Sequence, residues 1–109
     1  MGVIAPNSIV SRYGLSEAVI NDLRRVFSDF SEIERVLIFG SRAKGTFKDG
    51  SDIDLAVVAP TLTEQRFAAL WNAIDDLPIV FKIDLLHWDR LSNQVLKEAS
   101  SQQGIQIFP

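Results

Sequence analysis

The chain has 109 residues, of which 47% are hydrophobic and 23% are charged, and its formal net charge is −3. This length is typical of one domain, so we expect a single domain over residues 1–109, in which residues 1–14 form a loose leader. The acidic balance argues against strong general binding to nucleic acid, which usually needs a basic surface. The absence of cysteine excludes disulfides and thiolate chemistry, and a single histidine leaves little for a zinc site.

Nothing in the sequence indicates contact with a membrane. No apolar run reaches the roughly 18 residues of a spanning helix. The first residues lack the basic-then-apolar pattern of a signal peptide, and Pro6 stands where a myristoylation signal needs Ser or Thr. We therefore expect a cytoplasmic protein.

The first half of the chain predicts one helix and two strands. Ser16 is a good N-cap, and apolar residues follow it at helical spacing. The short β-branched and aromatic run at 34–40 predicts a strand. Residues 41–51 hold two glycines and three basic residues and predict an irregular loop, and residues 52–58 predict the second strand.

The second half predicts two more helices and the rest of a sheet. Residues 63–77 form an amphipathic pattern with apolar side chains, Trp71 among them, on one core-facing side. Residues 80–86 predict the third strand, residues 90–101 a last helix, and the alternation at 105–107 a short final strand. The order of elements predicts an α/β (α+β) fold, a small mixed β-sheet with helices packed on it.

Two aspartates begin the second predicted strand. Side chains alternate along a strand, so Asp52 and Asp54 project from the same face about 6.6 Å apart along the axis. Two carboxylates this close repel each other unless a cation lies between them. Because Mg²⁺ is usually bound by one or two carboxylates together with substrate phosphates, the pair predicts a metal site for a phosphorylated ligand.

The segment before this pair predicts a site for phosphate. Gly40 ends a strand and allows close approach of a ligand to the backbone, and Ser41 adds a hydroxyl and an N–H. Residues 41–50 have a net charge of +2 within an acidic protein. The candidate phosphate ligands are therefore Gly40, Ser41, Arg42 and Lys44, and the role of Lys48 stays open.

A third carboxylate, Asp84, lies in the middle of the third predicted strand between apolar neighbours. A charged group there is costly to bury unpaired. If this strand pairs with the second, Asp84 can complete a cluster of three carboxylates able to hold two metal ions about 3.5–4 Å apart. Lys82 falls on the same face, where it can contact a phosphate or simply neutralise charge.

These residues resemble a known family. Gly-Ser, then ten residues, then Asp-x-Asp, with a further Asp on a later strand, is similar to the signature of the DNA polymerase beta-like nucleotidyltransferases. Phe39-Gly-Ser-Arg-Ala-Lys-Gly45 and Ser51-Asp-Ile-Asp-Leu55 look like the minimal nucleotidyltransferase branch. The resemblance covers about residues 34–88 and implies the polymerase beta-like fold.

The resemblance also implies roles. Asp52 and Asp54 would bind two Mg²⁺ ions and the triphosphate, Asp84 would bind one ion and help to activate the acceptor hydroxyl, and Gly40 and Ser41 would bind the β and γ phosphates. The reaction would move a nucleoside monophosphate, with ATP the favoured donor. Minimal members are commonly encoded beside a HEPN-domain protein as a toxin–antitoxin pair, in which the nucleotidyltransferase silences the toxin, in some cases by transferring AMP to it.

Gly40 to Thr46 superficially resembles a P-loop. A P-loop is excluded, because Thr46 stands where the motif needs Lys after Gly45. His87 is a lone histidine and is interpreted as structural. Two other functions fit the same residues: a binding antitoxin that neutralises its partner by contact alone, and a phosphohydrolase built on the same carboxylates. The sequence does not identify the acceptor or the oligomeric state.

Overall fold

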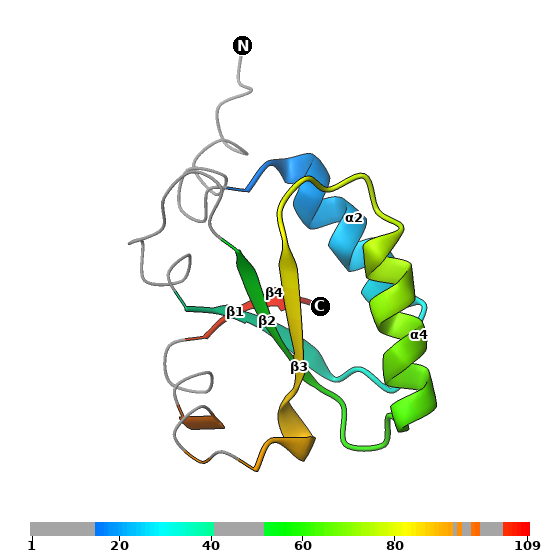
Figure 1. Cartoon of the computed structure of the whole chain (residues 1–109), viewed down its shortest axis with the longest axis vertical. Helices are drawn as coiled ribbons and strands as arrows, with labels where there is room; N and C mark the ends of the chain where they lie inside the picture. Colours follow the sequence, from blue (N-terminus) through cyan, green and yellow to red (C-terminus); the bar gives the residue numbers. More distant parts are fainter. Residues whose placement is uncertain (1–14, 41–51, 93, 95–96, 99–103) are drawn as a thin grey trace.

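The computed structural model describes residues 15–40, 52–92, 94, 97, 98 and 104–109. In this part of the chain a four-stranded sheet with the order β3-β2-β1-β4 carries two helices (Figure 1). The elements are α2 (Glu17–Ser28), β1 (Arg35–Phe39), β2 (Ile53–Val58), α4 (Glu64–Asp75), β3 (Ile83–His87), the 3₁₀ helix η1 (Trp88–Arg90) and β4 (Ile105–Phe108). The predicted α/β fold, helices on a small mixed sheet, is confirmed.

Both helices begin at a capping side chain. The Ser16 hydroxyl accepts a hydrogen bond from the Val19 N–H at 3.2 Å, as predicted for the first helix. Thr63 caps α4 in the same way. α4 ends earlier than the predicted 63–77, because the Leu77 N–H turns back to the Ile74 carbonyl. Neither of these helices, nor any other helical stretch in the described residues, is long and apolar enough to cross a membrane.

The sheet is mixed because its pairings differ in direction. β1 runs antiparallel to β2 and β4, whereas β2 and β3 are parallel. The predicted strands at 34–40 and 52–58 correspond to β1 and β2. The third was predicted at 80–86, but β3 begins at Ile83, since the chain first turns at 77–79 and reaches β2 only where the Ile53 N–H donates to the Lys82 carbonyl.

The two faces of the sheet have different coverings. The main core lies between the sheet and the helices and includes Ile38, Leu55 and Leu85, which pack with residues of α2 and α4. A smaller cluster on the other face holds Leu37, Phe39 and Ala56, with Leu86 and Trp88 packed against it. Because side chains alternate along a strand, positions 54 and 84 lie on this second face, away from the helices.

The chain after β3 differs from its prediction. The expected helix at 90–101 is wrong at its start, where Arg90 belongs to η1 and residues 91–92 are not helical. The Leu91 N–H closes this turn on the Trp88 carbonyl, and the Asp89 carboxylate accepts from the Ala59 N–H at 2.7 Å. Residues 94, 97 and 98 are helical, the rest of that segment lies outside the described residues, and the final strand is confirmed as β4.

One ion pair connects α4 to the segment between α2 and β1. The Arg66 guanidinium donates to both Glu32 carboxylate oxygens, at 2.8 Å from Nε and 3.0 Å from Nη2. It also lies over the Phe30 ring, 4.6 Å from the centroid. The hydrogen bonds from Arg66 lower the pKa of the Glu32 carboxyl from 4.5 to about 2. The pair therefore stays ionised across the physiological range.

This pair predicts a pH-dependent stability. A carboxyl whose pKa is lowered by folding stabilises the native state fully above its unfolded pKa, and this contribution disappears as the pH falls through about 2. Glu32→Gln should therefore have a lower melting temperature than the wild type at pH 7, with the difference closing near pH 2. Glu34→Gln, at an exposed position nearby, is the matched control. An equal difference at both pH values would contradict the assignment.

Candidate active site

The candidate site centres on two carboxylates in register. Asp54 of β2 lies directly opposite Asp84 of the parallel strand β3, and both side chains are half-buried. Neighbouring strands lie about 4.8 Å apart, and opposite residues point to the same side. The buried residues on either side of each aspartate face the helices and fix this direction. The condition stated for Asp84, that the third strand pairs with the second, is therefore met.

Asp52, the third predicted carboxylate, is placed differently. It lies one residue before β2 and is exposed, so the strand ladder that directs Asp54 and Asp84 does not extend to its side chain. In residues 15–40, 52–92, 94, 97, 98 and 104–109, no three Asp, Glu or His side chains stand close enough to hold a metal ion. The structure thus assembles two of the three predicted carboxylates and leaves Asp52 beside them.

Gly40 contacts the carboxylate of Asp54. Its φ angle is +75°, a left-handed conformation that favours glycine. A Cβ built on Gly40 would lie 2.6 Å from Oδ2 of Asp54. From the sequence, Gly40 was expected to let a ligand come close to the backbone. In the structure it is the carboxylate of Asp54 that lies close to Gly40. The one sequence feature that indicated a contact between Gly40 and Asp54 was the position of the glycine, at the end of a predicted strand and before the aspartates.

The rest of the predicted phosphate site follows Gly40 in the sequence. Ser41, Arg42, Lys44 and Lys48 lie outside the described residues. Gly40 places the start of this segment at the end of β1, next to Asp54. The phosphate-binding role of residues 41–44 therefore stays a prediction.

The described residues suit a magnesium ion. Carboxylate oxygens are the ligands that Mg²⁺ prefers, and it is usually held by one or two of them together with phosphate. Asp54 and Asp84 offer such oxygens side by side, and Gly40 leaves room that a side chain would fill against Asp54. In this arrangement Asp54 and Asp84 would hold the ion, with Asp52 next to them.

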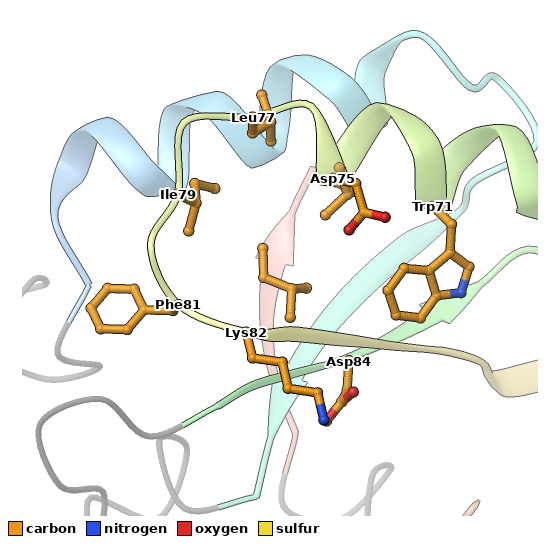
Figure 2. A pocket seen from close by; sticks show the side chains of 9 residues that line it. Trp71, Asp75, Leu77, Ile79, Phe81, Lys82 and Asp84 are labelled. Atoms are coloured by element: carbon orange, nitrogen blue, oxygen red, sulfur yellow. The ribbon is translucent and has the colours of Figure 1, made fainter.

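A pocket of about 250 Å³ lies beside Asp84 at the β3 edge of the sheet. Lys82, Ile83 and Asp84 line it at the start of β3, and Figure 2 shows Trp71 and Phe81 on opposite sides of it. The sequence placed Trp71 in the core, but it is only half-buried. The pocket was not predicted, because its wall forms only when the end of α4 and the turn after it meet β3. The lining residues are Trp71, Ile74, Asp75, Leu77, Ile79, Phe81, Lys82, Ile83 and Asp84.

His87 has a structural environment, as interpreted from the sequence. It is buried at the end of β3, and its Nε2–H donates to the Ala59 carbonyl at 2.8 Å. Its ring stacks on Phe67 of α4, with 5.2 Å between centroids. These contacts hold the ends of β2 and β3 to α4, on the face away from Asp54 and Asp84.

Removing this imidazole should affect stability and not chemistry. His87→Leu leaves the buried Ala59 carbonyl without its donor, so the free energy of unfolding should fall by about 1–2 kcal/mol. Urea unfolding measures the loss, and the nucleotidyl transfer rate of the folded variant should equal that of the wild type. Loss of transfer at unchanged stability would instead place His87 in the chemistry.

Comparison with known proteins identifies this architecture. The model of the family described as Polymerase beta, Nucleotidyltransferase matches residues 21–109. Among solved structures, a toxin–antitoxin with AMP-PNP is 26% identical, with a TM-score of 0.60 over 81% of this chain and 71% of that one. A mutant of the toxin–antitoxin MntA-HpeT is 22% identical, with a TM-score of 0.57 over 81% and 70%. A candidate nucleotidyltransferase from Sulfolobus solfataricus is 24% identical, with a TM-score of 0.56 over 91% and 84%.

The mixed sheet with helices on one face is thus the fold of a nucleotidyltransferase domain. A search of curated proteins gave no match. Since the family model covers most of its length, the chain belongs to the polymerase beta nucleotidyltransferase family, and the toxin–antitoxin structures support its minimal branch. The resemblance seen in the sequence is confirmed.

Proposed function

We propose that this protein transfers a nucleoside monophosphate, AMP from ATP, to an acceptor hydroxyl and releases pyrophosphate. The observation that carries the proposal is the register of Asp54 with Asp84, with Gly40 packed against Asp54, in a chain of this family. Asp54 of β2 pairs with Phe39 at the end of β1, where the basic segment 41–50 begins, and Asp84 lies opposite Asp54 on β3. A carboxylate pair next to a basic segment suits a metal-bound polyphosphate. Catalytic roles for Asp52, Asp54 and Asp84 follow from this proposal.

In the proposed reaction the acceptor oxygen forms a bond to the α-phosphorus. The bond from that phosphorus to the bridging oxygen breaks, and pyrophosphate leaves with the electron pair. Asp84 accepts the hydroxyl proton, directly or through water, and passes it to solvent. Gly40 and Ser41, helped by Arg42 and Lys44, bind the β and γ phosphates. Asp52, Asp54 and Asp84 would hold Mg²⁺, two ions in the full proposal, and the metal would supply a lower pKa for the acceptor hydroxyl and neutralise charge on the triphosphate.

The proposed partner is a toxin. Two similar structures are toxin–antitoxin proteins, one of them with AMP-PNP. By this similarity, together with the resemblance seen in the sequence, we assign this chain the antitoxin role, with a HEPN-domain protein as the toxin and the cytoplasm as the location. The single-domain organisation of residues 1–109 is part of the same proposal.

The test is a transfer assay with the product of the neighbouring gene. The protein, Mg²⁺, the partner and ATP labelled at the α-phosphate are incubated, and the partner is examined for label and for mass added in steps of one AMP. Omission of Mg²⁺ is the control. Transfer that requires Mg²⁺ supports the enzyme. A stable complex without transfer would replace it by a binding antitoxin, and release of phosphate in place of pyrophosphate would identify a phosphohydrolase.

A further inference from the structure

We infer that a second copy of this chain docks at the β3 edge of the sheet, so that the protein forms a symmetric dimer. The docking surface, called here the edge surface, consists of Trp71, Asp75, Ile79, Val80, Phe81 and Lys82. This inference goes beyond the proposed function and does not depend on it. The pocket is walled by α4 on the helix side of the sheet, whereas the side chains of Asp54 and Asp84 project from the other face.

Val80 is an apolar side chain that the fold leaves in solvent. Its exposed fraction is 92%, and no other large apolar side chain of the described residues is exposed. Its neighbours Ile79 and Phe81 are half-buried, line the pocket and pack against the core. The Ile79 N–H donates to the Leu77 carbonyl at 2.8 Å and so holds the turn from which Val80 projects. Contact with a partner would remove this apolar surface from water.

The pocket next to Val80 can receive a side chain of this kind. Its volume of about 250 Å³ exceeds that of a valine side chain, and Figure 2 shows Trp71 and Phe81 on opposite sides of it. Because both neighbours of Val80 line the pocket, Val80 lies at its rim. A two-fold axis at this edge can therefore place the Val80 of each copy in the pocket of the other. An isologous interface needs such a reciprocal fit, because one surface serves both partners.

The charges of the edge surface are complementary in the same way. Asp75 and Lys82 are exposed and line the pocket, and neither forms an ion pair with another described residue. Two-fold symmetry lets Lys82 of each copy face Asp75 of the other. A partner of a single charge would satisfy only one of these side chains, whereas a second copy satisfies both. For this reason we assign the edge surface to a second copy.

The edge is open, and the interface is small. β3 stands at one end of the strand order β3-β2-β1-β4, so among the described strands it has a neighbour on one side only. The contacts that carry the interface are one valine and one ion pair in each direction. Because interfaces of this size are weak, we expect a dissociation constant on the order of 10–100 µM.

Sedimentation velocity from about 5 to about 500 µM protein tests the dimer, and it should show a change from one chain to two across this range. Val80→Asp places a charge in the apolar pocket and should weaken association at least about tenfold. Its far-UV circular dichroism should match that of the wild type, because position 80 is exposed. Thr61→Asp puts the same residue at another exposed, β-branched position, away from the edge surface, and should dimerise like the wild type.

Two further measurements locate the interface. Asp75→Lys and Lys82→Glu should each weaken the dimer about fivefold, because like charges then face each other, and the double variant should regain the wild-type affinity. The chain has two tryptophans, and only Trp71 lines the pocket. Its indole signal in a ¹H–¹⁵N spectrum should shift with protein concentration while that of Trp88 stays in place, and Trp88→Phe assigns the two signals.

Several results would overturn the inference. They are a wild type that stays a single chain at the highest concentration, a dimer that Val80→Asp does not weaken, a double charge variant no tighter than the single ones, and a Trp71 signal that does not shift. A single-chain wild type whose complex with the toxin is lost in Val80→Asp would assign the edge surface to the toxin instead. The transfer assay decides only the proposed function, since dimerisation requires no nucleotide.

Discussion

Asp54→Asn should lower the rate of AMP transfer by at least about 10³-fold while the fold is retained. Asparagine has nearly the same shape but no charge, so it removes the proposed Mg²⁺ ligand that lies between Gly40 and Asp84. Because asparagine keeps the size and shape of the side chain at this half-buried position, the melting temperature should stay close to that of the wild type. The initial rate in the transfer assay and a thermal unfolding curve measure the two effects.

The control for this substitution is Asp29→Asn. Asp29 is exposed at the C-terminal end of α2, and its backbone N–H, which the substitution keeps, caps the helix. Its transfer rate should match that of the wild type. If Asp54→Asn transfers AMP at the wild-type rate, Asp54 is not part of the mechanism. If it loses transfer but still neutralises the toxin, contact alone accounts for neutralisation.

Gly40→Ala should reduce both stability and activity. An alanine at φ +75° costs about 1–2 kcal/mol, which for a domain of this size lowers the melting temperature by roughly 4–8 °C per kcal/mol. The new methyl group would also lie 2.6 Å from Oδ2 of Asp54 and would push the carboxylate away from its position opposite Asp84. We expect transfer to fall by about 10²-fold, because small displacements of catalytic groups have effects of this size.

Gly104→Ala provides the comparison. Of the glycines in the described residues, only Gly40 has a positive φ angle, so an alanine at 104 carries no such strain. Its melting temperature and transfer rate should stay close to those of the wild type. A Gly40→Ala protein with full activity would show that Asp54 can move without consequence, and the arrangement described here would then not be the catalytic one.

Local sequence signals predicted most of the fold. Ser16 and the apolar spacing after it gave α2, and the β-branched run before Gly40 gave β1. The errors lie where tertiary contacts override local pattern. Residues 80–82 have the composition of a strand, but pairing with β2 begins only at Ile83. Trp88–Arg90 became a 3₁₀ helix because Asp89 bonds to the backbone of Ala59, thirty positions earlier in the chain.

The candidate site was predictable for a different reason. Its residue types and spacing indicated Gly40, Asp54 and Asp84, and strand pairing brings these three into one row. The pocket at the β3 edge was not predictable in this way. Trp71 and Phe81 look like ordinary core residues in sequence, and only the meeting of α4 with β3 gives them a common surface.

The register between β2 and β3 also limits which insertions and deletions the protein can tolerate. Because side chains alternate, a shift of β3 by one residue would turn Asp84 toward the helices and bring the buried Leu85 to the opposite face. Burying a carboxylate among apolar side chains while exposing a leucine is unfavourable on both counts. Insertions and deletions between α4 and β3 should therefore be tolerated where the added or lost residues stay in the turn. The buried apolar residues of β2 and β3, which stabilise the sheet, thus also keep Asp54 and Asp84 opposite each other on the same face.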